Sequence, residues 1–97
     1  MIHEEYIVLD TETDTQGRDA PDPEQDILKY VGVKYKDKRV CFHYTQKEQI
    51  QKAISWGKYI VGHNLNLYDK RVLERHGFKF NYKQVLIDTY EISENRL

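Results

Sequence analysis

Two acidic residues, Asp10 and Glu12, directly follow an apolar run near the start of the chain. The run, Tyr6 to Leu9, predicts a buried strand, and charge at the end of a buried strand is costly unless it is paired or bound to a metal. With one residue between them, the two carboxylates share a face, about 7 Å apart along the strand. Two divalent cations about 4 Å apart could be bridged there. Asp10 and Glu12 are therefore candidate catalytic acids and metal ligands, with a solvated strand end as the alternative.

A third acid, Asp69, ends the segment 61–69, which reads VGHNLNLYD. It begins a helical repeat at i, i+3, i+4 and i+7, whose members are Asp69, Val72, Leu73 and His76. Such a stripe is the face of a helix that packs on a sheet, so Asp69 is expected to point inward and to join Asp10 and Glu12 in one cluster. The alternative is an acid that favours the positive end of a helix dipole.

The ligand chemistry of these three acids favours a hard cation. Carboxylate oxygens are the ligands that Mg²⁺ and Mn²⁺ prefer. The histidines lack the paired spacing of a structural zinc site; they are His3, His43, His63 and His76. His63 adjoins the segment of Asp69 and is kept as a candidate substrate-binding residue, with core packing or capping as its alternative.

Two segments of the chain resemble the first and second motifs of the DEDD 3′→5′ exonucleases. They are Leu9 to Asp14 (LDTETD) and Asn64 to Asp69 (NLNLYD), and Ile87 to Thr89 resembles the strand end that follows them in the family. The resemblance is closest to the proofreading domains of bacterial and phage-type family A DNA polymerases. It implies a ribonuclease H-like fold, a two-ion site for Mg²⁺ or Mn²⁺, and hydrolysis of the terminal phosphodiester at a nucleic-acid 3′ end, releasing nucleoside monophosphates.

The same resemblance implies a role for each matching residue. Asp10 would hold both metals, Glu12 would ligate one metal and contact the attacking water or terminal sugar, and Asp69 would be an outer-sphere or second-metal ligand. The expected substrate-binding residues are Thr11, Thr13, His63, Asn64 and Tyr68. The expected partner is a single-stranded 3′ end, with DNA favoured over RNA.

The third motif of the family, a Tyr or His followed by the fourth acid on a later helix, is absent before Leu97. We therefore expect a partial, C-terminally truncated domain. Three interpretations remain open. The first is an exonuclease that obtains its fourth carboxylate from a longer parent chain, a second subunit in a homodimer or a partner polypeptide. The second is an inactive module that binds nucleic acid or metal. The third is a protein-interaction fold with vestigial acids.

The elements that must position these residues follow from periodicity and turn residues. Strands are predicted over residues 6–12, 27–35, 39–44, 59–62 and 84–88, and helices over 46–56 and 67–76. Thr45 and Glu48 form a capping-box pattern for the first helix, and Asn66 or a near neighbour is expected to cap the second. Residues 13–26, which hold both prolines, predict a loop or mobile segment. The order predicts one α/β domain over residues 1–97, a mixed sheet of about five strands with flanking helices.

Charge is unevenly distributed along the 97 residues. Residues 1–26 hold nine acids and one base, whereas residues 27–97 hold seven acids and fourteen bases. A basic surface facing a phosphate backbone, beside acids that bind cations, would give this asymmetry, although ordinary solvated faces would also do so.

Cellular location is inferred from composition. Cys41 is the sole cysteine; it lies between Val40 and Phe42 and is expected to pack as a small hydrophobe. The longest apolar run has four residues, too few for a signal peptide or a membrane span. A cytoplasmic protein without membrane contact is therefore expected.

Overall fold

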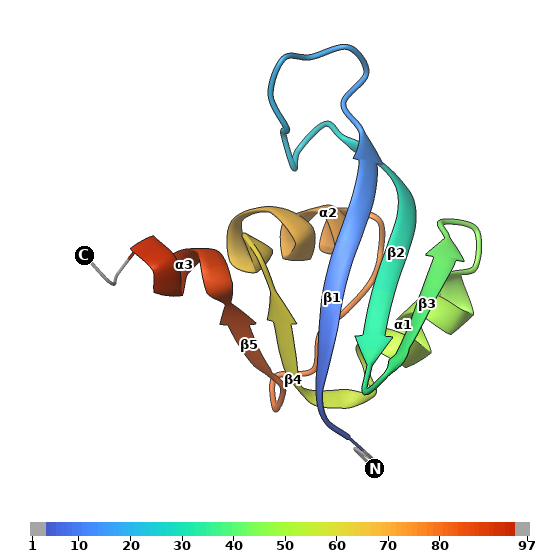
Figure 1. The fold of residues 1–97 in the computed structure, drawn as a ribbon. Helices are drawn as coiled ribbons and strands as arrows, with labels where there is room; N and C mark the ends of the chain where they lie inside the picture. The colour runs from blue at the N-terminus through green and yellow to red at the C-terminus, as the bar shows by residue number, and fades with distance from the viewer. Residues whose placement is uncertain (1–3, 95–97) are drawn as a thin grey trace.

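A computed structural model describes the backbone of residues 4–94 and the side chains of residues 6–91. Its sheet has the strand order β3-β2-β1-β4-β5 (Figure 1). The strands are β1 (Glu4–Asp14), β2 (Ile27–Tyr35), β3 (Lys38–His43), β4 (Gly57–Gly62) and β5 (Val85–Asp88). Strand β2 is antiparallel to both of its neighbours, β1 and β3, whereas β4 pairs parallel with β1 and β5 pairs parallel with β4. This arrangement confirms the predicted α/β class with a mixed five-stranded sheet.

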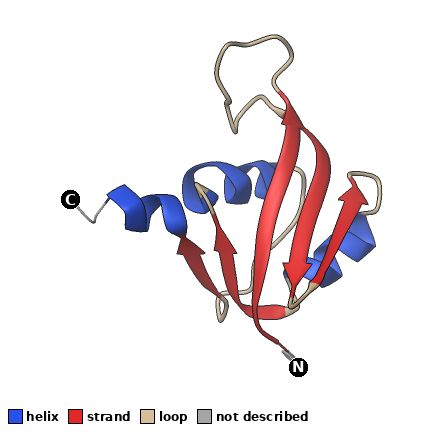
Figure 2. Cartoon of the chain, viewed as in Figure 1, coloured by secondary structure: helices blue, strands red, loops and turns tan. Residues whose placement is uncertain are grey.

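The helices are α1 (Lys47–Ile54), the single π-helical turn η1 (Leu65–Asp69), α2 (Lys70–Arg75) and α3 (Thr89–Glu94). Helices α1 and α2 lie on the same side of the sheet (Figure 2). The core forms between these two helices and the sheet. Alternate residues of β1 and β2, namely Ile7, Leu9, Val31 and Val33, pack against Ile50 and Ile54 of α1 and Val72 and Leu73 of α2. We name the opposite side, which carries Tyr6, Asp10 and Glu12, the open face. None of the described helices is both long and apolar enough to cross a membrane.

Cys41 lies on the open face, where it is exposed, so the expectation that it packs as a small hydrophobe is wrong. Its strand, β3, is an edge strand in which successive residues alternate between faces. Phe42 is half-buried against the core beside α1, whereas Cys41 points away from the helices. An apolar triplet in an edge strand therefore does not mean burial on both faces.

Helix α1 begins without the predicted capping box. Its N-cap is Gln46, and no side chain caps it through a hydrogen bond. The Thr45 hydroxyl instead bonds to His43 Nδ1 at 2.8 Å, and Gln46 Oε1 accepts the backbone N–H of His43 at 2.9 Å. These two polar side chains therefore stabilise the turn after β3 and leave the first N–H groups of the helix without a side-chain cap.

The long connection between β1 and β2 is held by Asp26. Its carboxylate is fully buried, forms an ion pair with Arg18, and accepts the Tyr68 hydroxyl at 2.6 Å and the Asp22 N–H at 3.0 Å. Burial by itself would raise the pKa of Asp26, but these hydrogen bonds outweigh it and lower the pKa. The predicted loop is therefore a segment anchored to η1, starting after Asp14 because β1 extends two residues further than expected.

Candidate active site

The end of β1 is where η1 meets the sheet. Strand β4 pairs with β1 only as far as Val8 and Val61 and ends at Gly62. The turn η1 follows and fills the space beside the remainder of β1. Gly62 permits this approach, because a Cβ there would lie 3.1 Å from both Leu65 Cβ and the Leu9 carbonyl oxygen. A glycine at this position thus lets η1 carry its last residue, Asp69, to the edge of the central strand.

Asp69 is buried at this edge, as the helical stripe predicts. It is 6% exposed, and the Thr11 hydroxyl donates a hydrogen bond to Asp69 Oδ1. Burial raises the pKa of Asp69 to about 6, and the nearby charges of Asp10 and Asp88 act in the same direction, against the Thr11 hydrogen bond. Asp69 is thus a carboxyl that would be more readily ionised if a cation were bound beside it.

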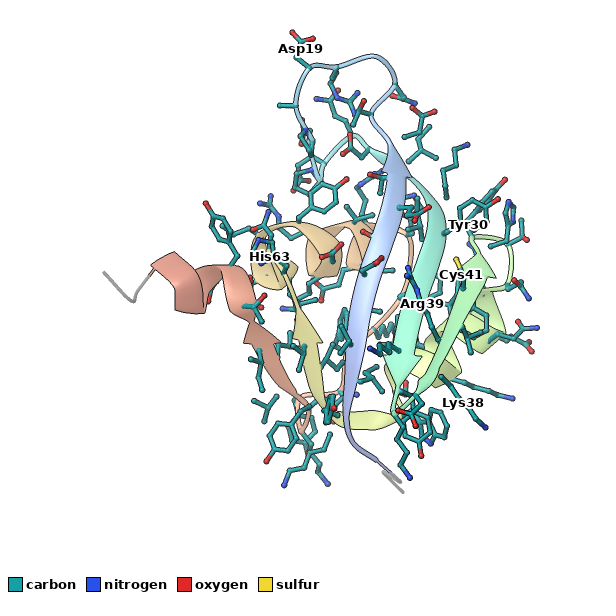
Figure 3. The ribbon with its side chains drawn as sticks, viewed as in Figure 1. Asp19, Tyr30, Lys38, Arg39, Cys41 and His63 are labelled. Atoms are coloured by element: carbon teal, nitrogen blue, oxygen red, sulfur yellow. The ribbon has the colours of Figure 1, made fainter. Side chains whose placement is uncertain are left out.

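Asp10 and Glu12 project from the open face, as their alternation predicts, and both are exposed. One oxygen of Asp10 lies 3.5 Å from Arg39 Nη2 on β3. Gly32, the register partner of Asp10 on β2, leaves room for this contact, since a Cβ there would lie 3.4 Å from Asp10 Oδ1 and 3.3 Å from Arg39 Nη2. In Figure 3 the Arg39 side chain lies across β2 toward β1.

The three acids lie on different sides of the end of β1: Asp10 and Glu12 are on the open face, and Asp69 is bonded to Thr11, which points to the other face. Thr11 alternates with Asp10 and Glu12 along the strand. Within residues whose side chains the structure describes, no group of three or more His, Cys, Asp or Glu residues is placed to hold a metal ion. Sharing of one cation by Asp10, Glu12 and Asp69 therefore stays a prediction.

Asp88, at the end of β5, is the residue whose role sequence reasoning missed. Its buried carboxylate accepts the backbone N–H groups of Asn64 at 2.8 Å, Asn66 at 2.9 Å and Tyr90 at 3.0 Å. Burial would raise the pKa of Asp88, but these donors outweigh it and lower the pKa. The signal was available, because an acid that ends the apolar run VLI is the same pattern as Asp10 after YIVL.

The start of η1 lies at Asn64, a near neighbour of Asn66, within the expectation that Asn66 or a near neighbour is the cap. Asn64 occupies the N-cap with a left-handed backbone (φ 60°) and makes no side-chain cap bond. Asparagine adopts this conformation more readily than most residues. Asp88, from a distant strand, accepts the helix-start N–H groups instead. The side-chain oxygen of Asn64 is buried and meets no hydrogen-bond donor within the described part of the chain.

The other expected substrate-binding residues have protein partners. The Tyr68 hydroxyl lies between Thr13 and Asp26. Burial, and to a smaller extent the bond to Asp26, raises the pKa of Tyr68 to about 12. His63 is exposed at the end of β4 (Figure 3). Its Nδ1 lies 3.0 Å from the Thr89 hydroxyl, and its ring meets the Tyr90 ring edge-on. Thr13 and Tyr68 thus link the site to the β1–β2 connection, and His63 links it to α3.

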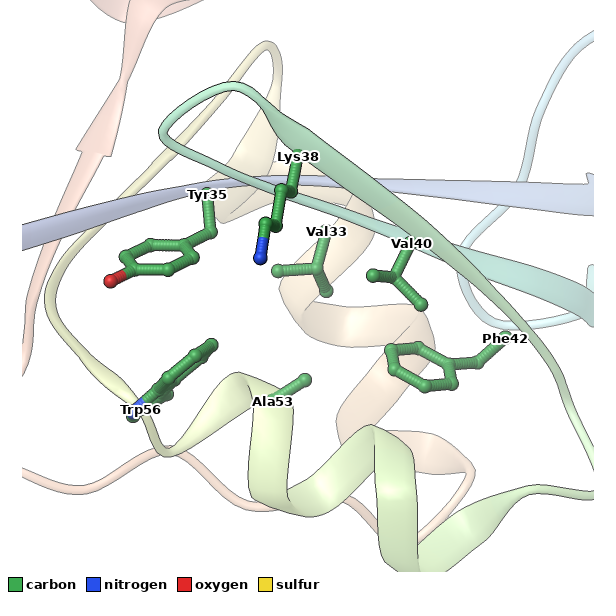
Figure 4. Close-up of a pocket in the computed structure, with 7 residues that line it drawn as sticks. All are labelled: Val33, Tyr35, Lys38, Val40, Phe42, Ala53 and Trp56. Carbon is green, nitrogen blue, oxygen red and sulfur yellow. The ribbon is translucent and has the colours of Figure 1, made fainter. Parts of the chain in front are cut away.

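A separate hollow lies between the β2–β3 hairpin and α1, on the helix-covered side (Figure 4). Its volume is about 210 Å³, and its lining residues are Val33, Tyr35, Lys38, Val40, Phe42, Ala53 and Trp56. The lining holds no acid and one cation, so this hollow lacks the chemistry of the strand-end acids.

Comparison with solved structures finds a polymerase of which one part shares this fold. Over 92% of its length the chain matches part of the family B DNA polymerase from the hyperthermophilic archaeon Pyrobaculum calidifontis, with a TM-score of 0.62 and 18% identity. The chain spans 16% of that polymerase chain. No protein-family model and no curated protein matches the sequence. At 18% identity the likeness shows a shared fold, and the closer resemblance to family A polymerases stays a prediction.

Proposed function

We propose that this chain acts on nucleic acid as a metal-dependent 3′→5′ exonuclease that hydrolyses the terminal phosphodiester of single strands. The observation that carries the proposal is the position of Asp69, a buried acid with a raised pKa, beside the strand end that presents Asp10 and Glu12. Perturbed acids of this kind concentrate at functional sites. Structural likeness to part of a DNA polymerase supports a role on nucleic acid.

The donor set suits the proposed Mg²⁺ or Mn²⁺ ions, since all three candidate ligands are carboxylates. Asp10 and Glu12 would hold the ions, with Asp69 as the second-metal or outer-sphere ligand. When bound, the ions would supply an activated water and stabilise the leaving oxygen. The protein's own part is positioning: Thr11 orients Asp69, Asp88 fixes the start of η1, and Gly32 leaves space beside Asp10. A fourth carboxylate would come from a longer chain, a second subunit or a partner polypeptide.

A second candidate is a module that binds a nucleic-acid end without cutting it. It is favoured by the pairing of Asp10 with Arg39, and by the lack of three gathered metal-binding groups among the side chains of residues 6–91. In this case the acids would contribute to binding geometry, and added metal would not lead to hydrolysis.

The test is 3′-end trimming of a 5′-labelled single-stranded oligonucleotide, as DNA and as RNA, with Mg²⁺ or Mn²⁺. We expect stepwise shortening that chelation abolishes and that Asp10→Ala lowers by at least about 100-fold, because a metal ligand is lost. Asp37→Ala, an exposed acid in the β2–β3 turn, is the matched control and should cut normally.

Equal trimming by wild type and Asp10→Ala would contradict the proposal. Binding of the oligonucleotide without any metal-dependent trimming would favour the second candidate. Calorimetric titration with Mn²⁺ gives an independent readout, in which Asp10→Ala should bind the metal more weakly than wild type.

A further inference from the structure

The open face of β1, β2 and β3 carries three cross-strand rows of side chains. Directly paired residues in antiparallel strands lie on the same face. From the end of β1 backward, the rows are Glu12, Tyr30 and His43; Asp10, Gly32 and Cys41; and Val8, Lys34 and Arg39. The acids therefore stand on β1, while an aromatic pair and two cations stand on the neighbouring strands.

The aromatic row offers surfaces on which bases can stack. Tyr30 is 42% exposed, and its ring meets His43 edge-on with the centroids 5.4 Å apart. His43 is oriented by the Thr45 hydroxyl at 2.8 Å and also contacts the Tyr44 ring, with centroids 4.5 Å apart. Both rings are thus fixed in direction, and every base has a face that can stack on such a ring.

The cationic row lies one step along the strands. Lys34 and Arg39 line a hollow of about 130 Å³ together with Val8, Asp10 and Gly32. Gly32 has no side chain to fill the hollow, and the Arg39 side chain is 61% exposed. A guanidinium suits the geometry of a phosphate, and its 3.5 Å contact with Asp10 is long for a hydrogen bond.

We propose that Tyr30, His43, Lys34 and Arg39 form a platform for a single strand of nucleic acid, with bases on the rings and phosphates on the cations. A single strand is the occupant that uses both features, since a duplex buries its base faces and an acidic peptide lacks them. The platform rests on the proposed function in that it would lead the strand to Asp10 and Glu12. Binding to the platform itself requires no metal.

The first test measures fluorescence anisotropy of labelled oligothymidine of about 12 nucleotides, in EDTA so that no cleavage occurs. We expect Tyr30→Ala to weaken binding about tenfold. Arg39→Gln and Lys34→Gln should each weaken binding and lower the salt dependence by about one counterion. Oligouridine in parallel distinguishes DNA from RNA.

The chain contains a matched control pair. Tyr82 is 89% exposed just before β5, and the Lys83 ammonium lies 5.8 Å from the centre of its ring. Tyr82→Ala and Lys83→Gln remove the same side-chain types as the platform variants but lie outside the three rows. Both should bind oligothymidine as wild type does, and losses equal to those of Tyr30→Ala would overturn the platform.

Cys41 supplies a readout that needs no substitution. It is the sole cysteine, is exposed, and lies in the middle row of the platform. Saturating oligothymidine should slow alkylation of its thiol by iodoacetamide, because the bound strand covers it. An unchanged alkylation rate, or equally tight binding of polyglutamate, would overturn the platform.

The two proposals fail separately. Binding that depends on Tyr30 and Arg39 without any metal-dependent trimming would leave the platform standing and remove the exonuclease. Trimming that is unchanged in Tyr30→Ala and Arg39→Gln would remove the platform and leave the exonuclease standing.

Discussion

At the scale of one residue, the ionised carboxylate of Asp69 lowers the stability of the folded protein. Its carboxyl is nearly excluded from solvent and feels the charges of Asp10 and Asp88, so its pKa is raised from 3.8 to about 6. The folded state therefore binds a proton at Asp69 more tightly than the unfolded state does. Between these two pKa values, stability falls as pH rises, and the loss is complete above the folded pKa.

Asp69→Asn should consequently stabilise the fold at pH 8, by about 1–2 kcal/mol after allowance for solvent screening. Asparagine keeps an oxygen that can accept the Thr11 hydroxyl and carries no charge. The gain should shrink toward zero near pH 4, where Asp69 is protonated in the folded state. Urea unfolding of both proteins at the two pH values measures it, with Asp37→Asn as an exposed control, and a less stable variant at pH 8 would refute the account.

At the scale of elements, the site depends on how β5 is joined to η1. The Asp88 carboxylate holds the backbone of Asn64, Asn66 and Tyr90, so it links the end of β5 to the starts of η1 and α3. The far end of α2 is closed locally. Gly77 has φ 95°, and the N–H groups of Gly77 and Phe78 bond to Glu74 and Leu73 as in a Schellman motif. One end of the helical segment is thus set by tertiary contacts and the other by its own sequence.

Asp88→Ala should lower the free energy of unfolding by about 2–3 kcal/mol at pH 7, because buried N–H groups lose their acceptor. Since the folded pKa of Asp88 is below 3.8, its charged-form stabilisation is fully present above that value and is lost as pH falls through the folded pKa. The stabilities of wild type and Asp88→Asn should therefore converge in acid. Denaturation curves across pH 2–7 test this, and a constant difference over the range would contradict it.

At the scale of the whole molecule, the open face has two unlike halves. The half over β2, β3 and the end of β1 is polar. The half over β4, β5 and the start of β1 has a shallow hollow of about 390 Å³ lined by Tyr6, Tyr59, Val61 and Ile87. Val31 and Val33, which alternate along β2 with residues of the open face, are buried against the helices. Val8 points to the open face, because it lies two residues before Asp10 on β1 and alternate residues of a strand share a face.

The apolar half predicts self-association or docking of a partner polypeptide, since apolar patches of this kind mark interaction sites. Light scattering at micromolar concentration should show oligomers. Val85 is the register partner of Tyr59 in the apolar half, so Val85→Lys should shift the oligomers toward monomer. Val40→Lys is a matched control, because Val85 is 45% exposed on one edge strand and Val40 is 47% exposed on the other. A monomeric wild type that binds no hydrophobic dye would contradict the prediction.

Local patterns in the sequence determined the elements and the facing of most candidate residues. Alternation along β1 placed Asp10 and Glu12 on one face, and helical spacing turned Asp69 toward the sheet. These inferences succeed because strand and helix periodicity depend on near neighbours in the chain. The acidic end of β5 was equally readable, although its role was not.

Only the tertiary structure decided which partners these residues meet. Asp69 reaches Thr11 because β4 stops at Gly62 and leaves the edge of β1 to η1, and no local pattern records where a neighbouring strand ends. Asp88 replaces a local cap because it lies next to the start of η1 in space, 24 residues away from Asn64 in the chain. Cys41 is exposed because it lies on the open face of the edge strand β3, which no helix covers among the described residues. Each of these outcomes depends on contacts between distant segments, which strand order and strand length control.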